Sequence, residues 1–525
     1  HIEWGQAKAG ETRHFLDWMY GINISRALTK SMKKAGRFTL MSSGRVQSPA
    51  LKIIADKERE IQAFQPTPYW VVSADVTHKK ESFTVQYEED KLWEESKAKQ
   101  IVQECNKSST GDVTDVDKRV WTQKAPIPFN LGGLQSEAYK TLGLSPKQTL
   151  QIAQDLYTKG YTSYPRTSSQ KLPKSIGYKK IFSKLKKNTP YKELIESLPK
   201  KLKPRNGKKK DPAHPAIYPT GEKAKGLKGK EAKMYDLIVR RFMATFGPSA
   251  KRQTTTININ ITGHNFNTKA TKTVEKGWHI YYGPFLRYKE ENIASVDNGA
   301  SVSVDEAHSE EKETQPPRRY TKASLVKELE RQGLGTKATR ADIVENLYKR
   351  GYADGKSIEV SELGLKLSKT LEEHIPDIVS PELTRHFEEQ MEEIRNEKTE
   401  PELVLEEAKK TLTTILETFQ GQEKAIGEEL LDSHQKMMKK KNTLGPCPKC
   451  DTGELMIRKG KYGKFAACNE YPDCKTTFSL PKKAKIIPTE ETSDTGHPMI
   501  KVIKKGKKPQ VISVNPDDNM SDDAT

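Results

Sequence analysis

The chain has 525 residues, of which 34% are hydrophobic and 30% are charged, so it is long enough for several domains with apolar cores. Its 90 Lys and Arg residues exceed its 70 Asp and Glu residues, and the net charge of +20 favours a polyanionic partner. Its apolar runs are far shorter than the roughly 18 residues of a membrane helix, and it shows no targeting segment, which excludes a membrane protein.

The N-terminal part is predicted to be helical, and its most informative stretch is "SSGRVQSPALKIIADKEREI" (42–61). Ser48 followed by Pro49 predicts an N-cap and a first-turn proline. A helix N-terminus can bind phosphate, and Arg45 and Gln47 can reach a nucleic-acid backbone or base. Two interpretations stay open at this point: an ordinary capped helix and a nucleic-acid contact.

Strands and helices then alternate. "YWVVSADVTH", "SFTVQYEE" and "GDVTDVDKRVW" predict strands within 68–125, and helices follow at 128–160. The segment 171–210 has 15 Lys or Arg residues against 2 acids, so we expect a basic, mobile connection. A helix at 229–245 precedes "QTTTININITGHNFNTKA" and "GWHIYYGPF", which predict further strands. Lobes built from discontinuous segments follow from this order.

A helix-turn-helix pattern begins at "RYTKASLVKELERQGLGTKATRADIVENLYKRGYADG". One helix ends near Gly333, a four-residue connection follows, and a second helix starts after Thr336, with a wing at 352–363. The basic and hydroxyl residues at the start of the second helix favour phosphate, although many surface helices begin in this way. Glu-rich helices continue to about residue 430.

Four of the five cysteines form the strongest local signal, with the spacing Cys-x2-Cys-x17-Cys-x5-Cys. They are Cys447, Cys450, Cys468 and Cys474. This spacing is typical of tetrahedral structural zinc, in a reducing compartment. The intervening "RKGKYGKFAAC" supplies the lysines and aromatic rings of a ribbon that binds single strands. Cys105 stands alone and is predicted to be a small core residue.

"TSYPRTSSQ" (162–170) raises the question of a nucleophile. The phenol of Tyr164 has an ordinary pKa of about 10 and needs activation, which a cation such as Arg166 can supply while it also holds a phosphate. Pro165 restricts the backbone, and the hydroxyls of Thr167 and Ser168 can donate to phosphate oxygens. The other interpretation is a surface loop with a packed ring.

Taken in order from about residue 7 to 480, these segments resemble type IA DNA topoisomerases. "SSGRVQSPAL" resembles the DNA-contacting motif of that family, and "PFNLGGLQSEAYKTLGLSPKQTLQIAQDLYTKGYTSYPRT" resembles the segment that ends in the catalytic tyrosine. "AHPAIYPT" resembles its histidine motif, "LGTKATRADIV" a later active-site segment and "GKFAACNEYPDC" its zinc ribbons. "SYPRTSSQKLP" is closest to archaeal members.

The resemblance implies roles for individual residues. Tyr164 is implied as the nucleophile, with Arg166 and Thr167 beside the scissile phosphate. The active site is implied to be completed by Gln154, His214 and Thr339. DNA contacts are implied for Arg13, His14, Asp17, Ser42, Ser43, Gly44, Arg45, Val46, Gln47, Ser48, Lys337 and Arg340. The sequence departs from the pattern of many bacterial members at Thr158, where they carry glutamate, and at Ser168, where they carry aspartate.

The implied fold is a multi-domain α+β, toroidal core of helical lobes with an inserted β lobe, followed by a zinc ribbon. The expected parts are a helical DNA-binding lobe at 1–66 with 317–430, winged-helix-like at 320–363; a β-rich gate lobe at 67–127 with 228–316; a catalytic tyrosine lobe at 128–227; and a zinc ribbon at 444–482. "TSDTGHPMIKVIKKGKKPQVISVNP" predicts a second, degenerate ribbon at 490–516, without cysteines or metal. Residues 517–525 are expected to be a disordered tail.

The implied activity is that of an isomerase. Tyr164 breaks one DNA strand through a 5′-phosphotyrosine link, another strand passes, and rejoining relaxes negatively supercoiled DNA without ATP. The expected partner is DNA, especially its single-stranded regions, and the expected state is a monomer in the cytoplasm, associated with the nucleoid.

The family also places a magnesium-binding Toprim domain before the region where this sequence starts. Since the first residue is His1 and no such domain is present in the sequence, we expect a fragment whose Mg²⁺ would come with the absent domain. Two alternatives remain open: the topoisomerase half of a reverse gyrase, and a DNA-binding clamp without chemistry.

Overall fold

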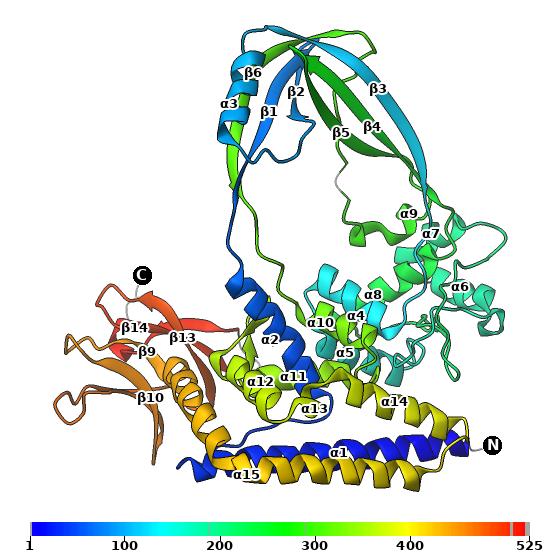
Figure 1. The fold of residues 1–525 in the computed structure, drawn as a ribbon. Coiled ribbons are helices and arrows are strands. Elements are labelled where there is room, and N and C mark those ends of the chain that lie inside the picture. The colour runs from blue at the N-terminus through cyan, green and yellow to red at the C-terminus, as the bar shows by residue number, and fades with distance from the viewer. Residues whose placement is uncertain (1–2, 188, 289, 505–507, 520–525) are drawn as a thin grey trace. The chain divides into compact units, whose positions relative to one another are not determined.

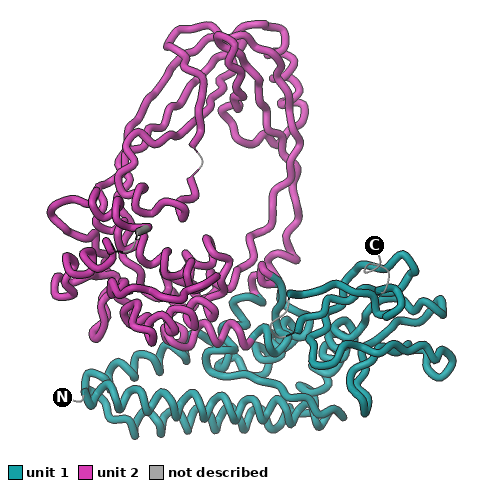
Figure 2. Tube along the Cα trace, turned by 180° about the vertical axis from the view of Figure 1, so that it is seen from behind, with its two compact units in different colours: residues 1–55, 347–355, 359–525 teal, residues 56–346, 356–358 magenta. Residues whose placement is uncertain are grey.

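The structure is a computed structural model that describes residues 3–187, 189–288, 290–504 and 508–519 (Figure 1). The chain divides into two compact units (Figure 2). Unit 1 comprises residues 1–55, 347–355 and 359–525, and unit 2 comprises residues 56–346 and 356–358. This division is coarser than the lobes expected from the sequence, whose boundaries stay a prediction. Within the described ranges, no helix is both long and apolar enough to cross a membrane.

Long helices form the body of unit 1 (Figure 1). The helix α1 (Trp4–Lys34) lies along α15 (Pro401–Asn442) and also contacts α14 (Pro381–Arg395). The buried residues of α1 recur every three or four positions, which is the spacing of one helix face. The remaining elements of this body are α12 (Glu362–His374), α13 (Pro376–Val379), β7 (Ala353–Asp354) and β8 (Glu359–Val360). Since β7 and β8 pair antiparallel, the predicted wing is present.

A glycine sets how closely α1 and α15 approach. A Cβ atom on Gly427 would lie 2.1 Å from the carbonyl oxygen of Ser31, far inside van der Waals contact. The two backbones therefore touch where no side chain intervenes, and any larger residue at this position must separate the helices.

Two small sheets complete unit 1. The first has the order β12-β11-β10-β9 and the second the order β13-β14-β15, with antiparallel pairing throughout. The strands are β9 (Thr443–Pro446), β10 (Glu454–Gly460), β11 (Gly463–Cys468), β12 (Thr477–Ser479), β13 (Ala484–Thr492), β14 (Pro498–Lys504) and β15 (Gln510–Ser513). Both sheets contribute to one hydrophobic core, which contains Leu455 and Ala466 from the first and Ile500 and Val502 from the second.

The end of the chain differs from the expected disordered tail. Residues Pro516–Asn519 form the short 3-10 helix η4, which is tied back to the second sheet by hydrogen bonds of Asp518 and Asn519. The rest of the expected tail, 520–525, lies outside the described residues.

In unit 2, six strands close into an antiparallel barrel with the order β1-β2-β5-β4-β3-β6 (Figure 1). They are β1 (Pro68–His78), β2 (Glu81–Tyr87), β3 (Thr110–Gln123), β4 (Ala250–Ile261), β5 (His264–Glu275) and β6 (Ser301–Glu313), with α3 (Glu95–Cys105) packed against them. Cys105 is fully buried in the barrel core, as predicted. The strands come from two separated stretches of chain, as the alternation of patterns predicted.

A helical body makes up the rest of unit 2. Its helices are α4 (Leu131–Leu142), α5 (Pro146–Thr158), η1 (Lys174–Ile176), α6 (Tyr178–Lys186), η2 (Thr189–Tyr191), α7 (Lys192–Glu196), α8 (Gly229–Ala244), α9 (His279–Tyr282), η3 (Gly283–Phe285), α10 (Lys322–Arg331) and α11 (Arg340–Lys349), the last of which extends into unit 1. The two helices of the predicted helix-turn-helix are present as α10 and α11, but α10 ends at Arg331 and α11 begins at Arg340, so the connection is longer than the four residues predicted.

Three local predictions were wrong. The segment 171–210 contains α6, which buries Tyr178, Phe182 and other apolar residues, so it is not merely a mobile connection. "GWHIYYGPF" forms α9 and η3 rather than a strand, because its aromatic residues pack into the helical core at helical spacing. The helix α2 (Gln47–Ala63) begins before Ser48, which therefore lies inside the first turn and is not the N-cap.

We predict that Gly427→Ala destabilises unit 1 by about 1–3 kcal/mol, because the new methyl group meets the Ser31 carbonyl. Gly421→Ala is the matched control, since a Cβ atom there has no neighbour within 4 Å and alanine improves helix propensity by about 1 kcal/mol. Urea unfolding of both variants measures the difference. Equal stabilities would contradict the close approach of the two backbones.

Candidate active site and nucleic-acid interface

The backbone that precedes Tyr164 is held in place by a capped helix, a turn and two backbone hydrogen bonds. Ser145 caps α5 with a capping box, and the chain turns at Gly160, whose φ of +76° favours glycine. The following residues pair with another segment: the N–H of Ser163 donates to the Tyr218 carbonyl at 2.9 Å, and the N–H of Thr220 donates to the Tyr161 carbonyl at 3.0 Å. Tyr164 therefore follows a strand-like stretch with little freedom.

The ring of Tyr164 is half-buried and contacts two other rings. Its centroid lies 4.7 Å from that of His214 and 5.3 Å from that of Tyr157 on α5. Within the part of the chain that the structure describes, the Tyr164 hydroxyl has no hydrogen-bond partner. The packed ring and the unpaired hydroxyl together leave an oriented phenol oxygen available for a ligand.

The two residues after Pro165 differ in whether their side chains are already hydrogen-bonded. The Nε of Arg166 is buried and has no hydrogen-bond partner among the described residues, which leaves one donor of the guanidinium unsatisfied. Thr167 is only 1% exposed, and its hydroxyl donates to the His214 carbonyl at 3.2 Å. The hydroxyl of Thr167 thus holds the histidine segment against the tyrosine segment.

The carboxylate of Asp211 joins three segments of the site. Its Oδ2 accepts hydrogen bonds from the N–H and the hydroxyl of Ser168, both at 3.0 Å, and lies 2.5 Å from the Lys337 Nζ. Its Oδ1 accepts from the N–H groups of Ala213 and His214. Burial opposes ionisation, but the hydrogen bonds from Lys337 and Ser168 outweigh it and hold the pKa of Asp211 well below its usual range.

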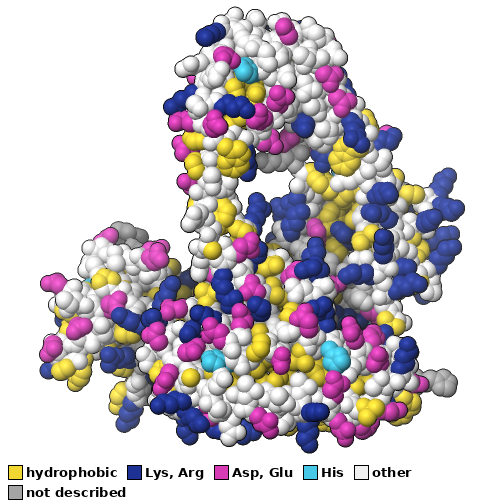
Figure 3. All heavy atoms as spheres, in the orientation of Figure 1, with side chains coloured by type: hydrophobic (Ala, Val, Ile, Leu, Met, Phe, Trp, Pro, Cys, Tyr) yellow, Lys and Arg dark blue, Asp and Glu magenta, His cyan; other side chains and the backbone are white. Residues whose placement is uncertain are grey.

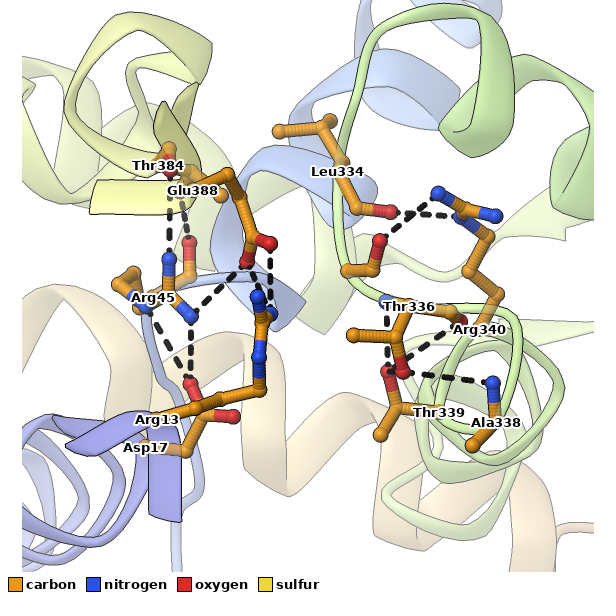
Figure 4. Close-up of polar contacts among 11 residues, drawn as sticks. Arg13, Asp17, Arg45, Leu334, Thr336, Ala338, Thr339, Arg340, Thr384 and Glu388 are labelled. Atoms are coloured by element: carbon orange, nitrogen blue, oxygen red, sulfur yellow. Dashed lines mark hydrogen bonds and ion pairs between the residues drawn. The ribbon is translucent and has the colours of Figure 1, made fainter. Parts of the chain in front are cut away.

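The turn between α10 and α11 is held by its own side chains (Figure 4). The Thr339 hydroxyl accepts from the Thr336 N–H at 3.0 Å, and the Arg340 guanidinium donates to the carbonyls of Leu334 and Gly335. This bonding fixes the backbone from which Lys337 reaches Asp211.

Gln154 and Thr158 both lie on α5, near the ring of Tyr157. Gln154 is half-buried and lies one helical turn before Tyr157, on the same side of the helix. Thr158 is exposed and donates to the Gln154 carbonyl within its own helix. No group of the site depends on the Thr158 hydroxyl, whereas Ser168 is part of the Asp211 cluster.

In unit 1, the arginine of the 42–48 motif is engaged by acidic partners (Figure 4). The side chain of Arg45 is 2% exposed; it pairs with Asp17 at 2.8 Å and with Glu388 at 3.2 Å and donates to the Thr384 carbonyl. Arg13 also pairs with Glu388, at 2.6 Å. These arginines connect α1, the 42–48 loop and α14, so their charges are largely neutralised in this structure.

The other implied DNA contacts in unit 1 differ in exposure. Ser42, Ser43, Gly44, Val46 and Ser48 are buried, whereas Gln47 is half-buried and donates to the Ser42 carbonyl at 3.0 Å. His14 and Asp17 are exposed on α1.

The four predicted zinc ligands converge. Their sulfur atoms all lie within 4.8 Å of one another, with separations of 3.8 Å between Cys447 and Cys474 and 3.6 Å between Cys450 and Cys468. A tetrahedron with Zn–S bonds of about 2.3 Å has sulfur atoms about 3.8 Å apart, which these distances match. Gly453 makes room for this arrangement, because a Cβ atom there would lie 2.4 Å from the Cys468 sulfur.

The comparisons with known proteins agree with this geometry. A family model described as DNA topoisomerase matches residues 1–406, and one described as topoisomerase DNA binding C4 zinc finger matches residues 445–483. The chain is 46% identical to DNA topoisomerase 1 of Pyrococcus horikoshii over 513 residues, covering 95% of this chain and 74% of that protein. It is 43% identical to DNA topoisomerase 1 of Methanothermobacter thermautotrophicus over 489 residues, covering 93% and 67%.

The same likeness extends to a solved structure. Full-length topoisomerase I from Thermotoga maritima aligns with a TM-score of 0.63 and 26% identity, over 93% of this chain and 78% of that one. The chain therefore belongs to the type IA DNA topoisomerases, and its C-terminal part is a zinc ribbon that holds a structural zinc ion. As a DNA topoisomerase it is an isomerase that acts on DNA.

Three residues of the site were not predicted from the sequence. Asp211 directly precedes "PAHPAIYPT", and its place between a lysine run and the histidine motif was a usable signal. Tyr157 lies seven residues before Tyr164 and could have been found as its aromatic neighbour across the Gly160 turn. Glu388 carries no signal, because it lies in a Glu-rich helix far from the arginines that it pairs with.

We predict that Cys468→Ser removes the bound zinc, because three thiolates and a hydroxyl make a weaker site. Zinc content measured by mass spectrometry on the purified chain is expected to fall from one ion to none. Cys105→Ala is the matched control, since that thiol is buried in the barrel core and its loss leaves the zinc content unchanged. A Cys468→Ser protein that keeps its zinc would refute the four-thiolate assignment.

Proposed function

We propose that Tyr164 is the nucleophile of the topoisomerase reaction. The observation that carries this proposal is the half-buried phenol of Tyr164, in contact with the rings of His214 and Tyr157. Its hydroxyl has no hydrogen-bond partner among the described residues, and the unpaired Nε of Arg166 is two residues away. A ring that is already held by two neighbouring rings loses little entropy when its oxygen reacts.

The reaction is a transesterification. The phenol oxygen of Tyr164 forms a bond to the phosphorus of one DNA strand and loses its proton, while the bond to the 3′ oxygen breaks and that oxygen takes up a proton. The product is a 5′-phosphotyrosine link with a free 3′-hydroxyl. The reverse attack rejoins the strand, so the energy of the broken ester is retained and no nucleotide is required.

The neighbouring residues act on the phosphate and on one another. Arg166 stabilises the charge that develops on the phosphoryl oxygens through its guanidinium, whose Nε has no hydrogen-bond partner among the described residues. Asp211 is a positioning residue, because it holds the segments of Ser168, His214 and Lys337 in one arrangement. Gln154 and Thr339 are proposed to complete the site from α5 and from the turn before α11.

Magnesium has no supporting donor set near Tyr164. Among the described residues, only the four cysteines and Glu373, His374 and Glu429 form clusters that could hold a metal, and neither cluster includes Tyr164 or its neighbours. The magnesium dependence expected from the family stays a prediction, and a chelator added to the cleavage assay, which should abolish adduct formation, tests it.

The DNA that is bound is proposed to be single-stranded at the site of cleavage, with a basic surface beside it. Lys and Arg side chains gather over α6 and α7 (Figure 3). The segment that follows α7 carries the exposed residues Lys200, Lys201 and Lys203, and its backbone joins the tyrosine segment where the Gln170 N–H donates to the Lys209 carbonyl. A strand that follows these lysines would be led by its phosphates toward Tyr164.

The chain is proposed to act as a monomer on negatively supercoiled DNA, in the reducing compartment in which thiolates stay available to zinc. The comparisons give no support to a reverse gyrase half or to a clamp without chemistry. The covalent-adduct test below separates the enzyme from such a clamp.

We predict that Tyr164→Phe abolishes the covalent DNA adduct in the full-length protein, because the variant keeps the ring packing and lacks the attacking oxygen. Adducts with a labelled single-stranded oligonucleotide are measured after denaturation. Tyr157→Phe is the matched control: it removes a hydroxyl from the adjacent ring and should still form the adduct. A covalent adduct formed by the Tyr164→Phe variant would contradict the assignment of Tyr164 as the nucleophile.

We predict that the double substitution Lys200→Glu and Lys201→Glu weakens binding of a single-stranded oligonucleotide. The slope of log Kd against the logarithm of the salt concentration should become shallower by about one to two. The matched control is Lys409→Glu with Lys410→Glu, an adjacent exposed pair on α15 that changes the net charge equally. Fluorescence anisotropy at several salt concentrations measures both. Equal losses in the two variants would show that net charge alone governs binding.

A further inference from the structure

The second C-terminal ribbon repeats the first in sequence and in topology. "CDTG" at 450–453 corresponds to "SDTG" at 493–496, and "NEYPDC" at 469–474 corresponds to "VNPDD" at 514–518, with one residue fewer. The order β13-β14-β15 repeats the order β9-β10-β11, again with antiparallel neighbours. By this correspondence Ser493, Ser513 and Asp518 stand where the zinc ribbon has Cys450, Cys468 and Cys474.

These replacements converge as the cysteines do. The Oδ2 of Asp518 accepts hydrogen bonds from three hydroxyls: those of Ser493 at 2.9 Å, Thr495 at 2.7 Å and Ser513 at 2.6 Å. Its Oδ1 accepts from the side-chain amide of Asn515 at 3.1 Å. The Nδ1 of His497 lies 3.1 Å from Oδ2.

We propose that the carboxylate of Asp518 replaces the zinc ion as the centre that holds the second ribbon together. A zinc ion is a cation surrounded by four anionic sulfurs, whereas here an anion is surrounded by hydrogen-bond donors, so the polarity of the site is inverted. In both ribbons the central group joins the loop after the first strand to the end of the third strand.

The environment of Asp518 fits a structural anion. Its side chain is 9% exposed, and the hydroxyls that face it come from the loop after β13 and from the end of β15. The hydrogen bonds from Ser513 and Thr495 are the main causes that lower the pKa of Asp518 to about 2, so it stays ionised at neutral pH.

A consequence follows for the whole C-terminal module. The ribbons share one hydrophobic core, and the His497 ring packs edge-on against Phe478 of the first ribbon at 5.4 Å. Loss of zinc or oxidation of its thiolates removes the centre of the first ribbon only. The second ribbon is thereby a metal-independent support beside a metal-dependent one.

The test compares Asp518→Asn with Asp517→Asn in the full chain. The two variants remove the same charge from adjacent positions, but the Asp517 side chain is exposed and has no hydrogen bond among the described residues. Hydrogen exchange followed by mass spectrometry is expected to show about tenfold faster exchange of β14 and β15 amides in Asp518→Asn, the effect of losing charge-assisted hydrogen bonds. Zinc content should stay at one ion per chain in both variants.

A second variant and a chelator make the result decisive. Ser513→Ala removes one donor to Asp518 and should speed the same amides, while zinc removal should expose the amides of β10 and β11 and leave those of β15 protected. Identical exchange in Asp518→Asn and Asp517→Asn would overturn the proposal. Opening of the second ribbon together with the first on zinc removal would overturn it as well.

Discussion

The buried carboxylate of Asp211 is the constraint on which the proposed active site depends. It accepts hydrogen bonds from the segment after Tyr164, from the backbone of His214 and from Lys337, which lies 126 residues further along the chain. A carboxylate out of contact with water is stable only when its oxygens are satisfied, so the three segments must meet in one arrangement. The orientation of the phenol follows from that arrangement and from the rings beside it.

The C-terminal ribbons meet a similar demand with two chemistries. Short sheets bury too little apolar area to fix the conformation of their loops. A central ion or charged group, bound by residues of those loops, stabilises them instead. In the first ribbon that group is zinc held by four thiolates. In the second ribbon we assign the role to Asp518, with hydroxyl donors at positions that correspond to cysteines. The two ribbons pack on one shared core, and each has its own polar centre.

The positive charge of the chain serves two purposes. Arg45 and Arg13 are paired with acids inside unit 1, where they fix the 42–48 loop and contribute little to the external field. Lys200, Lys201 and Lys203, which follow α7, remain exposed and define a surface suited to phosphates. Net charge therefore predicts the class of partner, whereas the pairing of each cation determines whether it can meet that partner.

The sequence by itself determined the features that depend on local spacing: the cysteine ribbon, most of the strands with their alternating pattern, and the helix that leads to Tyr164. Tertiary structure decided the rest. Aromatic residues at 277–285 became helical because a helical core was there to receive them, and α6 is ordered because its apolar face is covered. The pairing of Asp211 with Lys337 could not be predicted from spacing, because contacts between segments far apart in the chain arise only when folding brings them together.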